Sequence, residues 1–257
     1  MGTSSSFKGK IGNALLPDDF NLNNQLLDEN ENNDEDNVEE NNPIENNSNW
    51  TTAKTSMSKY ISSSGKVGTP KNIVRNYIKA AGGSNRLIYN STRSRNATFN
   101  IGNILRKFTT DGISKTLDEL GVSLSHYSLP EAMSKLVNYV ENSAVSKSDV
   151  AIRTATANTL EKLIELDLKD DKLDKAAATV LMEYFMADLI WQHMLIDFGY
   201  SFEKYGDNLD TLVKIEEEIT TYIKANVEEA FKRNKDKIFS KDMYDDIMRS
   251  CLQIMEE

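Results

Sequence analysis

The residues best placed for covalent chemistry stand at the start of the sequence, which reads Met1-Gly2-Thr3-Ser4-Ser5-Ser6. Glycine after the initiator methionine is small enough for methionine aminopeptidase to act, so we expect the mature chain to begin at Gly2. Its free α-amino group would have a pKa of about 7.7–8.0, which makes it a competent nucleophile near neutral pH. The sequence therefore predicts a reactive amine at Gly2.

A second interpretation of the same residues is lipid attachment, because Gly2 with Ser6 fits the pattern for N-myristoylation. Lys8 and Lys10 add a small basic supplement. However, one myristoyl chain gives only marginal membrane binding, and the eleven acidic residues between positions 11 and 49 would repel an anionic leaflet. This pattern disfavours a membrane anchor.

Elsewhere the residue types and spacings of an enzyme are missing. The sequence has no nucleophile-elbow, phosphate-loop or dinucleotide-binding motif, and its two histidines and one cysteine do not have the spacing of zinc ligands. His193 lies in an apolar run and favours a structural core role over proton transfer. His126 lies in a polar loop segment. We expect a protein without catalytic residues, metal or cofactor, which is not an enzyme.

The charged residues are segregated along the chain. Residues 11–49 carry eleven acids and no bases, residues 50–110 carry eleven bases and no acids, and residues 111–257 carry 29 acids and 17 bases. A basic block with interleaved aromatic residues is typical of a nucleic-acid surface, but it also suits an acidic protein partner or the acidic part of the same chain. The candidate contact residues in this block are Arg86, Arg93, Arg95, Arg106 and Lys107.

These residues need elements to position them, and the composition divides the chain at position 49. Residues 1–49 are rich in Asn, Asp and Glu and cannot bury enough apolar surface to offset the entropy of ordering. We therefore expect a disordered N-terminal tail with a leader at 1–20 and an acidic tether at 21–49. The remainder, 50–257, is expected to form a helical domain with a basic part, 50–110, and an acidic part, 111–257.

Apolar residues recur with helical spacing throughout this domain, and no alternating run indicates a strand. Thr69-Pro70 predicts a helix start, Gly82-Gly83 its end, and Ser128 with Glu131 a capping box. The segment 175–198 is apolar on nearly every face and should be the central helix. We predict an all-α fold, an irregular bundle of about eight helices. No segment has the length of a membrane span or a secretory signal, so we expect a cytoplasmic protein without membrane contact.

Several of these short motifs, in this order, resemble the QatB family. The opening Gly2 to Ser6 and Leu15-Leu16-Pro17 are similar to the glycine- and serine-rich start and the Leu-Pro element of that family. Ala53-Lys54-Thr55-Ser56, the glycine pair Gly82-Gly83 and the arginine-bearing segment 86–95 resemble its next motifs. The resemblance covers roughly the first 100 residues.

The resemblance implies a non-enzymatic component of the Qat bacterial anti-phage defence system, which also encodes an ATPase, a QueC-like enzyme and a TatD-like nuclease. QueC-type enzymes activate the carboxylate of a 7-deazaguanine as an adenylate, which an amine then attacks. The chain would be an adaptor and the protein substrate of the QueC-like partner of the QatC type, with the ATPase as a further partner. Gly2 would receive the 7-deazaguanine group, and the leader residues Thr3, Ser4, Ser5 and Ser6 would thread into that partner's active site.

Overall fold

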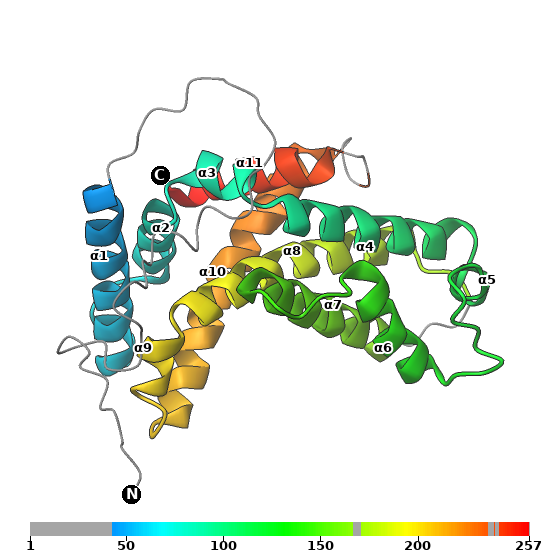
Figure 1. Ribbon diagram of the computed structural model, residues 1–257, viewed down its shortest axis with the longest axis horizontal. Helices are drawn as coiled ribbons and strands as arrows, with labels where there is room; N and C mark the ends of the chain where they lie inside the picture. The colour runs from blue at the N-terminus through cyan, green and yellow to red at the C-terminus, as the bar shows by residue number, and fades with distance from the viewer. Residues whose placement is uncertain (1–42, 167–170, 236–238, 240–241, 257) are drawn as a thin grey trace, which may run out of the picture. The chain divides into compact units, whose positions relative to one another are not determined.

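The computed structural model describes residues 43–166, 171–235, 239 and 242–256, and all the regular structure in this part of the chain is helical (Figure 1). The prediction of an all-α fold is confirmed. The helices are α1 (Pro43–Ser62), α2 (Pro70–Ala80), α3 (Ser84–Tyr89), α4 (Thr92–Thr110), α5 (Ile113–Glu119), α6 (Leu129–Val140), α7 (Lys147–Glu165), α8 (Lys175–Asp197), α9 (Gly199–Glu203), α10 (Leu209–Arg233) and α11 (Met243–Glu256).

The eleven helices of the described residues exceed the expected eight because short ones separate the longer ones. The apolar pattern from Ser84 to Phe108 is divided into α3 and α4 at Asn90 and Ser91. The Ser91 hydroxyl donates a hydrogen bond to the carbonyl oxygen of Leu87, one turn earlier, and such side-chain bonds compete with helix continuation. Arg86 consequently lies on α3, and the other four candidate basic residues lie on α4.

The first helix begins at Pro43, before the domain boundary expected at position 49. Proline is well suited to the first turn of a helix because its fixed φ is helical and its missing N–H would have no partner there. The helix therefore takes in Asn-rich sequence whose composition alone indicates disorder. The leader and most of the tether, residues 1–42, lie outside the described residues.

The predicted helix ends agree with the structure. The hydroxyl of Thr69 accepts a hydrogen bond of 3.2 Å from the backbone N–H of Asn72 at the start of α2. Gly82 and Gly83 follow α2 with positive φ angles of 93° and 86°, which glycine adopts without a steric penalty. At α6, the carboxylate of Glu131 accepts 2.8 Å hydrogen bonds from the backbone and hydroxyl of Ser128.

Helix α8 is central to the packing, as its apolar sequence predicts. It contacts α4, α7, α9 and α10, and Figure 1 shows it running beside α7. Its side chains Phe185 and Met194 are fully buried, and Trp191 is almost so. Burial of such side chains stabilises by about 1.5–3 kcal/mol each, which makes α8 the main support for the helices around it. None of the described helices has both the length and the hydropathy needed to cross a membrane.

Candidate functional site

The residues predicted to act lie in two parts of the chain. Gly2 and the leader residues Thr3, Ser4, Ser5 and Ser6 lie outside the described residues. The five basic candidates lie on α3 and α4, where they can be followed in detail. Arg93 and Arg106 are thirteen positions apart on α4, which corresponds to about 20 Å along a helix axis. The basic residues are therefore spread over the surface of α3 and α4, which we call the α3–α4 face, and they do not converge on one point.

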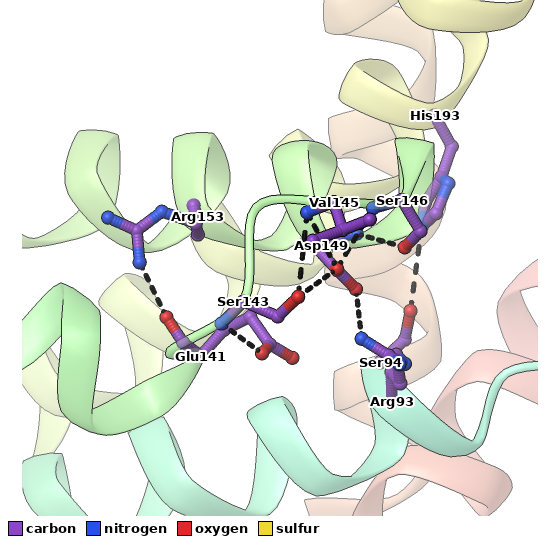
Figure 2. A network of polar contacts seen from close by, with 9 residues as sticks. All are labelled: Arg93, Ser94, Glu141, Ser143, Val145, Ser146, Asp149, Arg153 and His193. Atoms are coloured by element: carbon purple, nitrogen blue, oxygen red, sulfur yellow. Dashed lines mark hydrogen bonds and ion pairs between the residues drawn. The ribbon is translucent and has the colours of Figure 1, made fainter.

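Arg93 reaches across to the first turn of α7, where it meets the buried carboxylate of Asp149 (Figure 2). The Arg93 Nη1 atom lies 2.5 Å from Asp149 Oδ1, and the Asp149 side chain has no exposed surface. Its other oxygen, Oδ2, accepts hydrogen bonds from the Ser143 hydroxyl at 2.6 Å and the Ser146 backbone N–H at 3.0 Å. The backbone N–H of Val145 donates a further bond to Oδ2 at 3.2 Å.

This arrangement follows from local sequence. Ser146 caps α7, because its hydroxyl accepts a 3.1 Å hydrogen bond from the backbone N–H of Asp149. In return, the carboxylate of Asp149 accepts the hydrogen bond from the backbone N–H of Ser146. The pair is a capping box with aspartate at the third position. Burial alone would raise the pKa of Asp149, but the bonds from Ser143, Ser146 and Arg93 more than offset it and hold the pKa well below its usual range. The carboxylate thus stays charged and joins α4 to the start of α7.

Two more of the basic candidates also pair with acids of the same chain. Arg95 Nε lies 2.7 Å from Asp245 Oδ1 and joins α4 to α11, while Lys107 Nζ lies 2.9 Å from Glu119 Oε2 and joins α4 to α5. All three acidic partners belong to the acidic part of the chain, 111–257. Part of the positive charge of the basic block is therefore paired with acids of the same chain. This pairing is one of the alternatives that the charge segregation left open.

Arg86 and Arg106 are the two candidates that remain available. Both are exposed, and neither has an ion pair with any described residue. Two aromatic side chains are exposed on the same two helices, Tyr89 on α3 and Phe99 on α4. A surface with exposed arginines and aromatics can contact a partner, but its free positive charge is smaller than the sequence suggests.

His193 lies behind this face, and its surroundings agree with the structural role expected of it. Its Nε2 atom is 3.5 Å from the Ser94 hydroxyl, and burial lowers the pKa of the imidazole, so the neutral form is favoured (Figure 2). The ring borders a small cavity of about 80 Å³ that is lined mainly by apolar side chains and by Tyr77 and Tyr244.

Sequence reasoning missed the importance of Asp149. The signal was present in the spacing of Ser146 and Asp149, which fits the capping pattern of Ser or Thr followed three positions later by an acid. What the pattern does not contain is the ion pair with Arg93, because the two residues are 56 positions apart. Only the packing of α4 against α7 brings them together.

Comparison with known proteins identifies the family of this helical body. The model of the family described as "Qat anti-phage system associated protein QatB" matches residues 82–255, from the end of α2 to α11. Of the motifs that carried the resemblance, the match includes the glycine pair Gly82-Gly83 and the segment 86–95, while the motifs before Gly82 lie outside it. No curated protein and no solved structure matches the chain. Since the match spans well over half of the sequence, the chain belongs to the QatB family of proteins associated with the Qat anti-phage system.

Proposed function

We propose that this component of an anti-phage defence system is a non-enzymatic adaptor that becomes covalently modified at its N-terminal glycine. The modifying enzyme would be the QueC-like partner of the QatC type, and the attached group a 7-deazaguanine. The observation that carries the proposal is Gly2 itself, directly after the initiator methionine and before four small hydroxyl residues, in a member of this family.

The proposed reaction balances with components that a QueC-like enzyme supplies. ATP activates the carboxylate of the 7-deazaguanine as an acyl-adenylate and releases pyrophosphate. The neutral amine of Gly2 then attacks the acyl carbon, the new C–N bond forms an amide, and the C–O bond to AMP breaks. The amine loses a proton in the process. Near pH 8 about half of an α-amino group with its usual pKa is neutral, so the nucleophile needs little further activation.

The helical body would then hold the partners while the leader reaches the active site. Support comes from the ion pairs of Arg93, Arg95 and Lys107, which join α4 to α7, α11 and α5. These pairs help to fix the position of α4 on the helical body. The exposed Arg86, Tyr89 and Arg106 are available on it for docking. The ATPase of the same system is the second partner that this face would serve.

Mass spectrometry of the N-terminal peptide tests the proposal directly. We expect the peptide beginning at Gly2 to gain mass when the protein is made together with the other genes of its system, and to stay unmodified when it is made alone. The increment should equal the 7-deazaguanine carboxylate minus one water, as an amide bond requires. An unmodified Gly2 under both conditions would refute the proposal, and a fatty-acyl increment would establish the lipid anchor in its place.

Nucleic-acid binding by the α3–α4 face is the second candidate function, and the exposed Tyr89 and Phe99 beside Arg86 and Arg106 favour it. Two unpaired cations support a slope of log affinity against log salt of about −2 at most. We therefore expect weak retention of duplex DNA, changed less than about threefold by Arg86→Glu with Arg106→Glu. Lys71→Glu with Lys79→Glu, two exposed lysines of α2, is the control with the same charge change. A steep salt slope that only the arginine variant removes would favour the nucleic-acid function.

A further inference from the structure

A polar groove lies away from the α3–α4 face, between α7, α8 and α10, and has no part in the function proposed above. Its volume is about 330 Å³. That value falls at the small end of the range of about 300–1,000 Å³ for small-molecule sites. The groove lining includes Asn158 of α7, Tyr184, Asp188 and Gln192 of α8, and Glu216 and Lys224 of α10.

The helical period places these polar residues on facing surfaces. Tyr184, Asp188 and Gln192 follow one another at intervals of four on α8, so they share one face of that helix. Glu216 and Lys224 are eight positions apart and share a face of α10, about 12 Å apart along its axis. Since most of α8 is apolar and buried, a polar face with a carboxylate on the central helix requires an explanation beyond solubility.

Asp188 is held in a defined orientation by two side-chain amides. Its Oδ2 atom accepts a hydrogen bond of 2.8 Å from Asn158 Nδ2, and its Oδ1 atom accepts one of 3.0 Å from Gln192 Nε2. Burial raises the pKa of this carboxyl and the two amide bonds lower it, so the bonds partly offset the cost of burying the charge. Because a carboxylate only accepts hydrogen bonds, both amide nitrogens must face it, and both amide oxygens then point elsewhere.

The groove is therefore rich in acceptors. Each oxygen of Asp188 retains a free lone pair, and Glu216 adds a second carboxylate. Glu216 Oε1 accepts a 3.0 Å hydrogen bond from the indole N–H of Trp191, which fixes its position, and no described residue donates to its other oxygen. The ammonium group of Lys162 lies 5.5 Å from the centre of the Tyr184 ring, so this ring already contacts one cation and a cationic ligand has to use its other face.

We propose that this groove binds a guanidinium group between Asp188, Glu216 and the ring of Tyr184. A guanidinium offers five N–H donors in one plane, which matches several acceptors on different helices, and it stacks on aromatic rings. A simple ammonium has three donors and no plane to stack. Lys224, two helical turns from Glu216, lines the same groove and is positioned for an anionic group on the same ligand. The guanidinium belongs either to a free guanidino compound or to an arginine side chain of a protein partner.

Isothermal titration of the full chain with agmatine, a free guanidino compound, and with the peptide acetyl-Gly-Arg-Gly-amide distinguishes the two sources. We expect saturable one-to-one binding of at least one probe, at least tenfold weaker binding of n-butylamine, and no binding of urea, which lacks the charge. Binding of agmatine alone identifies a free compound, and binding of the peptide with equal or higher affinity identifies an arginine side chain.

Two variants tie the binding to the groove. Asp188→Asn should weaken binding at least tenfold, and Glu216→Gln about three- to tenfold. Glu217→Gln, which removes the same charge from the next residue of α10, should leave it unchanged. If Asp188→Asn fails to fold, as judged by circular dichroism, the titration of Glu216→Gln is the deciding measurement, because Glu216 is exposed. Absence of binding by both probes at 10 mM, or binding that is unaffected by the groove variants, overturns the proposal.

Discussion

Replacing Gly2 with proline is expected to abolish both the mass increment on the N-terminal peptide and protection against phage. Proline at position 2 still allows removal of Met1, so the chain would keep a free N-terminus of normal charge. That terminus is a secondary amine inside a ring, and the ring hinders its approach to the acyl carbon. The ring also fixes φ at position 2, so the leader cannot adjust its backbone there as it enters the active site. Plaque counts and the mass of the N-terminal peptide, measured in cells that carry the whole system, give the result.

The matched control is Gly9→Pro, which introduces the same residue into the same segment but leaves the terminal amine intact. It should retain the increment and most of the protection. Gly2→Ala keeps a primary amine with one added methyl group and should lie between the two. If Gly2→Pro carried the full increment, the modified atom would not be the Gly2 amine, and the proposed reaction would be wrong.

Replacing Asp149 with asparagine is expected to lower the free energy of unfolding by about 2–4 kcal/mol. The carboxylate accepts bonds from Ser143, Val145, Ser146 and Arg93, whereas an amide has a single acceptor oxygen and would turn its NH₂ toward donors. At least one of these four donors then loses its partner on Asp149. For a body of this size the loss corresponds to a fall in Tm of roughly 5–15 °C, which thermal unfolding monitored by circular dichroism at pH 7 would measure.

Asp245→Asn is the control for this prediction, because it removes the acid from the equivalent pair with Arg95. Both of those side chains are about one-third exposed, so the pair is screened by solvent and its loss should cost less than about 1 kcal/mol. Equal losses of stability in the two variants would show that the buried network at Asp149 contributes nothing beyond a surface ion pair.

The pH dependence of the same variant has a defined sign. The pKa of Asp149 is lower in the folded chain than the value of about 3.9 of an unfolded aspartate. The stabilisation is therefore complete above that unfolded value and is lost as the pH falls through the folded one. The difference in stability between the natural chain and Asp149→Asn should be constant from pH 7 to about pH 5 and should shrink below about pH 4.

Local sequence patterns predicted the helices because their causes are local. The cap at Thr69, the glycine pair after α2 and the capping box at Ser128 each depend on residues within one or two turns, and the structure has all of them. The apolar residues of α8 likewise identify the central helix, since a helix that is apolar over most of its circumference has to be buried. The division of the basic segment at Ser91 was not predicted, because the apolar spacing continues across it.

What the sequence by itself determined is the all-α fold and most of the helix starts and ends, because each depends on neighbouring residues alone. Only the tertiary structure decided what becomes of the charges. It paired Arg93 with Asp149 and Arg95 with Asp245 across 56 and 150 positions, while Arg86 and Arg106 are exposed and form no ion pair with any described residue. It also brought Asn158 to Asp188 and Trp191 to Glu216, which makes a groove out of polar residues that look like solvated helix faces in the sequence. The physical reason is that an ion pair or a groove depends on distances between helices, and the packing of the whole core sets those distances.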